Sequence, residues 1–339
     1  MAAIFFNMII LGIETSCDET SASIVKNGSV LSNFTYTQLI HSEYGGVIPE
    51  FASREHELII SLIVENAIKN AKINRTDIDA IGVTYGPGLM GALLVGVNFA
   101  KGMSIALGIP IIGINHLEGH IFANFIEYPE IQFPFLCLLV SGGHTQIWKI
   151  NNYQDYELLS TTQDDAAGEA FDKGARILSL NYPGGPEIDR ISKNGDPNKY
   201  KFSIPRIKNA EYDFSFSGLK TALFYLCKKM DEDVIHKEKS NLAASFQKAI
   251  VDTLLEKVEK CIISTGIKTI TLSGGVAANS YLRYKARTME SKYNFKFIFP
   301  SIEYCTDNAA MIGVAAYYYY KNNIFSDLCL VPNPNLKVN

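Results

Sequence analysis

The sequence predicts an α/β protein built from two related domains, and three observations support this. The chain has 339 residues, more than the roughly 250–300 residues at which a single hydrophobic core stops growing. Apolar runs of strand length alternate with segments that are amphipathic at helical spacing. Each half of the chain also opens on the same unit: a strand, a turn of small and polar residues, and a returning strand. This weak repeat favours two similar α/β domains that face a cleft.

The first half begins with an apolar strand at residues 9–14, and residues 21–25 return beside it as a hairpin. The turn between them, residues 15–20, carries hydroxyl groups and acids. Such a turn can line a phosphate or a metal-bound phosphate, and it can equally be a plain polar turn. An amphipathic helix is expected at residues 54–71, and a further strand at 80–84.

A glycine-rich loop at residues 85–91 precedes an apolar helix that runs to about residue 107. Glycines let backbone N–H groups approach an anion closely, and the N-terminus of a helix favours negative charge. The loop lacks the Gly-Lys-Ser/Thr ending of a Walker A motif, and it is not the G-x-G-x-x-G of dinucleotide-binding proteins. The pattern therefore indicates an anion-binding loop of neither kind.

A strand expected at residues 109–114 leads into two histidines, His116 and His120. On a helix this spacing places both imidazoles on one face, within reach of a single ion. A pair at this spacing is about as often a solvated or core pair, so a third ligand must decide. Asp307, at the first turn of the last expected helix, is the candidate ligand, and a helix cap is its alternative role.

The second half opens with an apolar strand at residues 135–140, a turn of small residues at 141–145 and a returning strand at 146–150. Acids in residues 164–173 open a helix, where they stabilise its first turn. One of them, Asp172, is alternatively a hydrogen-bond acceptor for a ribose or an amine.

Two glycine pairs in this half favour a nucleotide. Gly184 and Gly185 lie in a turn that allows close backbone approach to a ligand. A strand at residues 269–273 ends in a second pair, at 274–275, which opens another helix. A sheet edge of this kind can admit an adenine or a ribose, and Asn279 is placed at its entrance.

The composition excludes several classes of protein. The net charge is −4, so no global positive field attracts nucleic acid, and any RNA would meet local basic patches or patches that partners supply. The six cysteines are scattered without a C-x-x-C pair, which is typical of reduced thiols in the cytoplasm rather than a disulfide framework. No stretch reaches the ~18 uninterrupted apolar residues of a membrane span.

A set of motifs resembles, in order, the TsaD family (formerly Gcp or YgjD), the bacterial tRNA N6-adenosine threonylcarbamoyltransferases. The resemblance covers roughly residues 8–325 and is specific because so many motifs are in register. Asn115 stands where bacterial relatives often carry histidine, and the tail after Val331 matches poorly. The motifs are Glu14-Thr15-Ser16-Cys17-Asp18-Glu19-Thr20, the Gly-Pro-Gly loop, His116-x-x-x-His120, Leu139-Val140-Ser141-Gly142-Gly143-His144-Thr145, Gly168-Glu169-Ala170-Phe171-Asp172, Pro183-Gly184-Gly185-Pro186, Ser217-Gly218-Leu219-Lys220-Thr221, Ser273-Gly274-Gly275-Val276 and Cys305-Thr306-Asp307-Asn308.

The resemblance implies the two-lobed actin/Hsp70/sugar-kinase-like (ASKHA) fold, with a nucleotide cleft between the lobes. Residues 8–133 plus 308–327 would form the N-terminal lobe, which carries the His pair. Residues 134–307 would form the C-terminal lobe, which carries the nucleotide-binding glycine turns. The implied reaction transfers the threonylcarbamoyl group from threonylcarbamoyl-AMP to N6 of adenosine 37 in tRNAs that read codons beginning with A.

The resemblance also implies site residues, a metal and partners. The metal, Fe²⁺ by preference and Zn²⁺ as the alternative, would bind His116, His120 and Asp307 and position the acyl group; no covalent nucleophile is implied. The partners would be tRNA, a TsaB-like paralogue and a TsaE-like ATPase, in the cytoplasm and without a membrane. The implied substrate-binding residues are Leu139, Val140, Ser141, Gly142, Gly143, Asp172, Gly185, Asp189 and Asn279, with Glu14 and Asp18 as second choices.

Three other functions compete with this interpretation. A metallo-endopeptidase of the zincin type needs H-E-x-x-H, but Leu117 follows the first histidine here, and Glu118 is expected on another face of the helix. An ASKHA-type ATPase or sugar kinase would leave the His/His/Asp set unexplained. A non-catalytic scaffold paralogue would lack the His ligands, which this chain has.

Overall fold

The computed structural model describes residues 7–44, 46–203 and 211–338, without the side chains of 42–44 and 292–293. Two compact units divide the chain: residues up to Ile131 together with those from Thr306 onward, and residues 132–305. Each unit contains a five-stranded sheet. Asp307, at the expected boundary between the lobes, belongs to the first unit, as do both histidines. The three expected metal ligands therefore lie in one unit.

The sheet of the first unit is mixed, with strand order β3-β2-β1-β4-β5. Its first strand is central: β2 and β3 form an antiparallel meander on one side of β1, and β4 and β5 run parallel to β1 on the other. The strands are β1 (Ile9–Glu14), β2 (Glu19–Lys26), β3 (Ser29–Thr37), β4 (Ala80–Gly86) and β5 (Ile111–Asn115).

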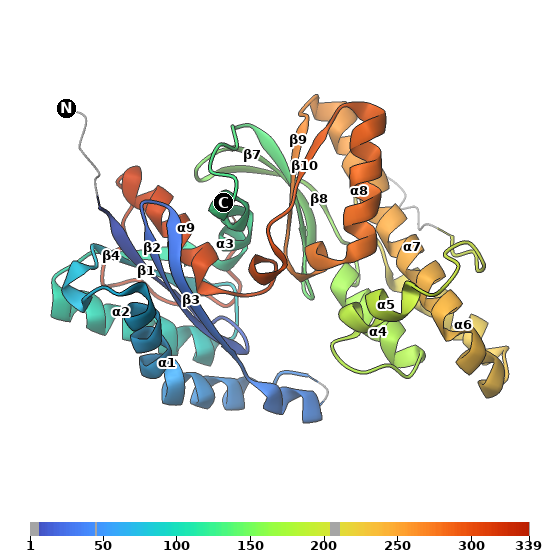
Figure 1. Cartoon of the computed structure of the whole chain (residues 1–339), viewed down its shortest axis with the longest axis horizontal. Coiled ribbons are helices and arrows are strands. Elements are labelled where there is room, and N and C mark those ends of the chain that lie inside the picture. Colours follow the sequence, from blue (N-terminus) through green and yellow to red (C-terminus); the bar gives the residue numbers. More distant parts are fainter. Residues whose placement is uncertain (1–6, 45, 204–210, 339) are drawn as a thin grey trace. The chain divides into compact units, whose positions relative to one another are not determined.

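Helices cover both faces of this sheet (Figure 1). Alternate residues of a strand point to opposite faces, so Leu11 and Ile13 share a core with residues of α1 and α2, whereas Gly12 faces the backbone of α9. The helices are α1 (Pro49–Ala71), α2 (Met90–Leu107), α3 (His116–Phe122) and α9 (Ala309–Lys321), with short 3₁₀ turns η1 (Leu39–Tyr44), η2 (Arg75–Asp77) and η3 (Ala123–Ile126).

In the described part of the chain, α2 is the helix that is long and apolar enough to cross a membrane by length and composition alone. Its buried residues include Ala92, Leu93, Val97 and Ala100, and it packs against α1 and β4. This packing is typical of a core helix, which passes the same test.

The tail after Val331 is part of the first unit, because it packs on the glycine-rich loop. Asn333 donates its backbone N–H to the carbonyl of Tyr85 at 2.7 Å, and Gly88 donates to the carbonyl of Pro334 at 3.2 Å. The next N–H, of Leu89, donates to the carbonyl of Ser16 at 2.8 Å. Two N–H groups that we expected to face an anion are thus engaged within the protein, and the loop serves to hold the tail and the turn after β1.

The second unit repeats the topology of the first, with strand order β10-β9-β6-β7-β8. Its first strand, β6, is again central, with an antiparallel meander on one side and two parallel strands on the other. The predicted pair of related α/β domains is confirmed. The strands are β6 (Phe135–Val140), β7 (Thr145–Asn152), β8 (Asp155–Thr161), β9 (Thr269–Ser273) and β10 (Lys296–Ile298).

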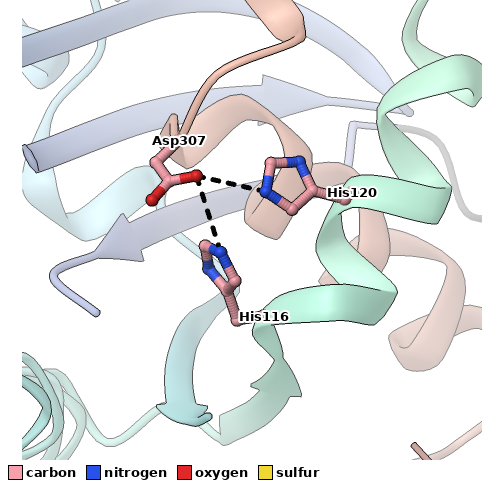
Figure 2. A group of neighbouring side chains, drawn as sticks. All are labelled: His116, His120 and Asp307. Atoms are coloured by element: carbon pink, nitrogen blue, oxygen red, sulfur yellow. Dashed lines mark hydrogen bonds and ion pairs between the residues drawn. The ribbon is translucent and has the colours of Figure 1, made fainter. Parts of the chain in front are cut away.

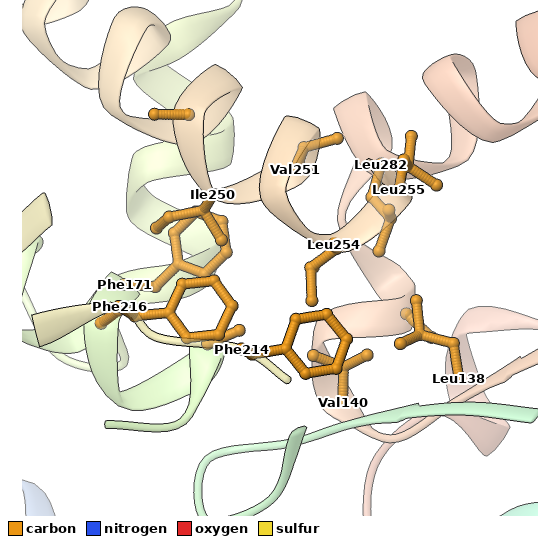
Figure 3. Close-up of a cluster of buried hydrophobic side chains, with 14 of the residues drawn as sticks. Leu138, Val140, Phe171, Phe214, Phe216, Ile250, Val251, Leu254, Leu255 and Leu282 are labelled. Carbon is orange, nitrogen blue, oxygen red and sulfur yellow. The ribbon is translucent and has the colours of Figure 1, made fainter. Parts of the chain in front are cut away.

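A large apolar core joins this sheet to its helices (Figure 3). Phe171, Phe214 and Phe216 are packed with Leu138 of β6 and Leu254 of α7, all at most 1% exposed. The helices are α4 (Ala167–Ile177), α5 (Gly184–Ser192), α6 (Ser217–Lys228), α7 (Glu232–Thr265) and α8 (Ser280–Tyr293), with 3₁₀ turns η4 (Gly275–Ala278) and η5 (Ile302–Tyr304).

The helix expected from residue 164 begins later, at Ala167, and Asp164 serves a different helix. Its carboxylate accepts from the backbone N–H groups of Phe216 and Ser217, at 2.8 and 3.2 Å, and from the hydroxyl of Ser215. These groups lie at the N-terminus of α6, where N–H groups lack partners within the helix. Asp164 therefore stabilises the start of α6 across 52 positions of sequence.

Candidate metal centre and nucleotide turns

The His pair lies on α3, a two-turn helix that follows β5 without a loop. Asn115 caps this helix, because its side-chain oxygen accepts the N–H of Leu117 at 2.9 Å. Asp307 comes from the loop before α9, whose cap is Asn308, accepting from Met311 N at 3.1 Å. The capping role considered for Asp307 thus belongs to its neighbour, and the Asp307 carboxylate turns toward the two histidines (Figure 2).

The three side chains converge on one point. Asp307 Oδ1 lies 3.1 Å from His120 Nε2 and 3.5 Å from His116 Nε2. One donor atom from each residue can be chosen so that all three lie within 4.8 Å of one another. Ligands that share an ion at bond lengths of about 2.0–2.2 Å lie roughly 3–3.5 Å apart. The arrangement is therefore compact enough for one metal ion.

The chemistry of the donors also fits a divalent transition metal. Imidazole nitrogens with a carboxylate oxygen suit iron and zinc, and three protein ligands leave further coordination positions open. Burial opposes protonation of His116, but Asp307 and Glu14 outweigh it and raise the pKa of His116 to about 9. Nearby, burial together with Asp307 and Asp18 raises the pKa of Glu19 to about 10. The carboxylates around His116 thus favour positive charge at this place.

The second-choice residues lie beside this centre without joining the three donors. Glu14, fully buried at the end of β1, contacts His116 at Nδ1, the nitrogen that faces away from Asp307. Asp18 lies in the turn after β1, where it interacts with Glu19 and Cys17. Sequence reasoning missed the partners of Glu14, which are Thr84 and Ser16. The sequence offered one signal for these contacts, which was a polar residue at the end of β4, the strand next to β1 in the sheet.

Glu118 does not face the metal donors. Its carboxyl group is buried and accepts a hydrogen bond from the hydroxyl of Tyr319 on α9. Burial raises the pKa of Glu118 to about 7. The acid between the histidines therefore attaches α3 to α9, which is not the role of a zincin general base.

The expected phosphate turn lies at the end of β6 in the second unit. Leu139 and Val140 are fully buried within the strand, where they pair with Gln146 and Thr145 of β7. A Cβ added to Gly142 or Gly143 would meet nothing within 4 Å, which shows open space at this turn. Ser141 Oγ accepts the N–H of His144 at 3.1 Å and closes the turn.

The other implied nucleotide residues hold the ends of α5 and α8. Asp172 accepts the N–H of Gly184 at 2.8 Å and also bonds the N–H of Gly185; burial nevertheless raises the pKa of Asp172. Asp189 accepts from the hydroxyl of Ser280 at 2.8 Å. Asn279 caps α8 through the N–H of Leu282 and donates to Gln247 at 2.7 Å. Each of these side chains therefore has a structural partner within the protein.

A cavity of about 310 Å³ lies next to these residues in the second unit. Its walls include Gln247 and Ser280, the hydrogen-bond partners of Asn279 and Asp189, and two tyrosines, Tyr281 and Tyr284. This volume is at the lower end of the range of small-molecule sites, about 300–1,000 Å³.

Comparison with known proteins identifies the family. The sequence model described as TsaD, tRNA N6-adenosine threonylcarbamoyltransferase, matches residues 29–314. A relative of that name from Thermosipho africanus is 55% identical over 98% of this chain and 100% of its own length. Another, from Caldicellulosiruptor saccharolyticus, is 51% identical over 92% of this chain and 93% of its own. The chain belongs to the TsaD family. Members of this family are transferases of tRNA modification, and the chain is an enzyme of that class.

Solved structures of lower similarity agree on the fold. HypF from T. kodakarensis matches with a TM-score of 0.65 over 94% of this chain and 48% of its own, at 15% identity. The activator of the 2-hydroxyisocaproyl-CoA dehydratase from Clostridium difficile, with bound ADPNP, matches at 0.54 over 93% and 97%, also at 15% identity. Similarity at this level bears on the fold alone, and the predicted ASKHA class is confirmed for this TsaD-family chain.

Proposed function

We propose that this chain transfers the threonylcarbamoyl group from threonylcarbamoyl-AMP to N6 of adenosine 37 in tRNAs that read codons beginning with A. The observation that carries the proposal is the match to the Thermosipho africanus transferase, 55% identical over the whole of that protein. The compact His/His/Asp set in the first unit supports a metal-assisted version of the reaction.

The donor does not require a covalent protein nucleophile. Threonylcarbamoyl-AMP is a mixed carbamic–phosphoric anhydride, so AMP is already a good leaving group. The exocyclic amine of adenosine attacks the carbamoyl carbon, the new C–N bond forms, and the bond from that carbon to the phosphate oxygen breaks. AMP departs with its oxygen, and the amine loses one proton. Because adenine N6 is a poor nucleophile, the protein must orient the two reactants and stabilise the developing negative charge.

His116, His120 and Asp307 would hold one divalent metal, Fe²⁺ in the first place and Zn²⁺ as the alternative. When bound, this ion would supply a Lewis acid beside the acyl group, with open positions for the threonyl carboxylate or carbonyl. The positions of the three proposed ligands are set by local structure. Asn115 caps α3, which carries both histidines, and Asp307 directly precedes the cap of α9.

The adenylate part of the donor would bind the second unit. The open turn at Gly142 and Gly143 supports a role for residues 139–143 in holding the phosphate, with the backbone N–H groups of these two glycines as its donors, because the N–H of Ser141 already donates to the carbonyl of His144. Asp172 fixes the turn that carries Gly185, and the cavity beside Asp189 and Asn279 supports binding of the adenosine part at that end. Glu14 and Asp18 remain second choices for direct contact with the donor.

We further propose that tRNA binding is shared with partners, because the net charge of −4 offers no global attraction for RNA. The proposed partners are a TsaB-like paralogue and a TsaE-like ATPase, and the proposed location is the cytoplasm.

The decisive experiment is a reconstitution with threonylcarbamoyl-AMP and unmodified tRNA, with the modified nucleoside read by mass spectrometry. The variants His116→Ala and Asp307→Ala should remain folded, lose bound metal and lose transfer, because each removes one of three donors. His236→Ala, at an exposed position of α7, is the matched control and should behave as wild type. Transfer at the full rate by a metal-free His116→Ala variant would refute the proposed role of the metal.

The same variants test the protease alternative. Cleavage of casein that survives repurification and is lost in His120→Ala would favour a metallo-endopeptidase. We expect no such cleavage, because the buried carboxyl of Glu118 is bonded to Tyr319 rather than facing the metal donors.

A further inference from the structure

The two metal histidines are held in different ways at their second nitrogen. His116 places Nδ1 3.1 Å from Glu14 Oε2 and 3.1 Å from Ser16 Oγ, while its Nε2 faces Asp307. His120 also turns Nε2 toward Asp307, but its buried Nδ1 has no hydrogen-bond partner among the described residues. The His116 ring is therefore oriented by polar contacts at its second nitrogen. The His120 ring has no such contact among the described residues.

Glu14 is itself held rigidly. It is the last residue of β1 and is fully buried. Its Oε1 accepts the backbone N–H of Ser16 at 2.5 Å, and its Oε2 accepts the hydroxyl of Thr84, on the adjacent strand β4, at 2.6 Å. The third donor available to this carboxylate is the Nδ1–H of His116. The carboxylate thus receives hydrogen bonds from three different segments of the first unit.

An ionised carboxylate can only accept hydrogen bonds. Both oxygens of Glu14 face hydrogen-bond donors, the N–H of Ser16 at Oε1 and the hydroxyl of Thr84 at Oε2, and this is the environment of an ionised carboxylate. Opposite such a carboxylate, His116 carries its proton on Nδ1, which leaves the lone pair of the neutral ring on Nε2. That nitrogen is the one directed at the shared point beside Asp307.

We propose that Glu14 is a positioning residue of the metal centre, which selects the tautomer and the ring orientation of His116 by accepting its Nδ1–H. Carboxylates behind metal-bound histidines commonly have this effect, and their loss typically costs about 10- to 100-fold in metal affinity. The inference rests on the proposed metal centre and adds to it a residue that makes no contact with the ion.

The variant Glu14→Gln tests this role because glutamine has the same shape and a defined orientation here. The N–H of Ser16 can only donate, so the amide oxygen must remain on the Ser16 side. The amide NH₂ then faces Thr84, whose hydroxyl can rotate to accept, and His116 Nδ1, which can accept only without a proton of its own. His116 would be driven to the tautomer with its proton on Nε2, where it cannot bind an ion.

We expect Glu14→Gln to bind Zn²⁺ about 10- to 100-fold more weakly than wild type, measured by calorimetric titration of the chelator-treated full chain. In the Zn²⁺-loaded wild type, nitrogen–proton NMR of labelled histidine should show His116 with a slowly exchanging proton on Nδ1. In Zn²⁺-loaded Glu14→Gln this proton should be lost. Unchanged affinity, or an unchanged Nδ1 proton, would overturn the inference.

Three further variants separate this role from general damage. Glu118→Gln removes another buried carboxyl on the metal helix and should leave Zn²⁺ affinity within about twofold of wild type. Ser16→Ala should also have a small effect, and a loss equal to that of Glu14→Gln would assign the role to the hydroxyl instead. Thr84→Val keeps Glu14 but removes one of its donors, so a loss of several-fold is expected, and this variant carries the test if Glu14→Gln does not fold.

Failure of the proposed metal centre is distinguishable from failure of this inference. If wild type binds no Zn²⁺, the metal centre itself is wrong and the role of Glu14 falls with it. If wild type binds Zn²⁺ and both His116→Ala and Glu14→Gln are measured, a loss in the first without a loss in the second refutes the positioning role alone.

Discussion

His56 of α1 holds the turn after β1 through a neutral imidazole. Its Nε2 lies 2.9 Å from the carbonyl oxygen of Cys17 and must donate to it, because a carbonyl only accepts. Its Nδ1, 2.6 Å from the hydroxyl of Thr20, must then accept. The ring is fully buried, and this burial lowers the pKa of His56. Protonation would place a charge in this buried site, so the folded state binds fewer protons here than the unfolded state.

This predicts a pH dependence with a definite sign. A histidine whose folded pKa is lowered contributes stability that is fully present above its unfolded pKa of about 6.5 and is lost as pH falls through the folded value. The denaturant concentration at the unfolding midpoint of wild type should therefore decrease when the pH is lowered from 7 to 5. In His56→Gln, which keeps a donor and an acceptor but does not titrate, the fall should be smaller. Denaturant unfolding at several pH values measures this, and parallel curves for the two proteins would contradict it.

At the scale of single residues, the sequence indicated which side chains could bind a metal or a ligand, but not which side chains contact one another. The spacing of His116 and His120 predicts a shared face, and the structure brings Asp307 to it. The backing of His116 by Glu14 depends on the register of β1 beside β4, which no local pattern encodes. The bond from Tyr319 to Glu118 likewise joins positions 201 apart, so it follows only from the packing of α9 on α3.

At the scale of elements, the close contact between β1 and α9 is made by glycines. A Cβ added to Gly12 would lie 2.6 Å from the backbone nitrogen of Gly313 and would also meet the carbonyl oxygen of Ala309. Neither of these backbone atoms can move without the whole helix. A glycine within a strand often marks such a close approach, so the sequence held a signal for this contact, although it did not name the helix.

We therefore predict that Gly12→Ala destabilises the first unit by roughly 1–3 kcal/mol or more, as expected for overpacking against an immobile neighbour. The control is Gly102→Ala in α2, where an added Cβ meets nothing within 4 Å. That change should stabilise by roughly 0.5–1 kcal/mol, because alanine favours the helix. Denaturant unfolding of both variants gives the comparison. Equal stability of the two would show that α9 does not pack on β1 in this way.

Hydrophobic periodicity predicted the positions of strands and helices well where those segments are buried in the core. The predicted strands at 135–140 and 269–273 have the observed bounds of β6 and β9. Three strands, β3, β8 and β10, were not predicted, because β3 and β8 are only partly buried and lack a long apolar run, and β10 is only three residues long. The early helix start at residue 164 was wrong because the acid there caps α6 instead. Local charge patterns cannot show which of several helix ends an acid serves.

At the scale of the molecule, the two units share one topology but differ in how the chain builds them. The second unit is one continuous segment, residues 132–305, with its own sheet and core. The first unit needs both ends of the chain, because α9 lies across its sheet and contacts β1, β2 and β4 as well as α3. The weak repeat of strand–turn–strand units predicts the shared topology. The return of the chain to the first unit was implied only by the family resemblance.

This difference predicts the folding of fragments. Residues 132–305 expressed alone should fold and unfold cooperatively, since the core around Phe171 and Leu254 is contained within them. Residues 1–131 alone should remain largely unfolded, because most of α9, including Met311, Ile312 and Tyr319, is buried in the complete first unit. Circular dichroism and dispersion of amide resonances would report both outcomes. Addition of a peptide of residues 306–339 should restore structure and Zn²⁺ binding to the 1–131 fragment. Cooperative unfolding of that fragment without the peptide would show that its sheet does not need α9.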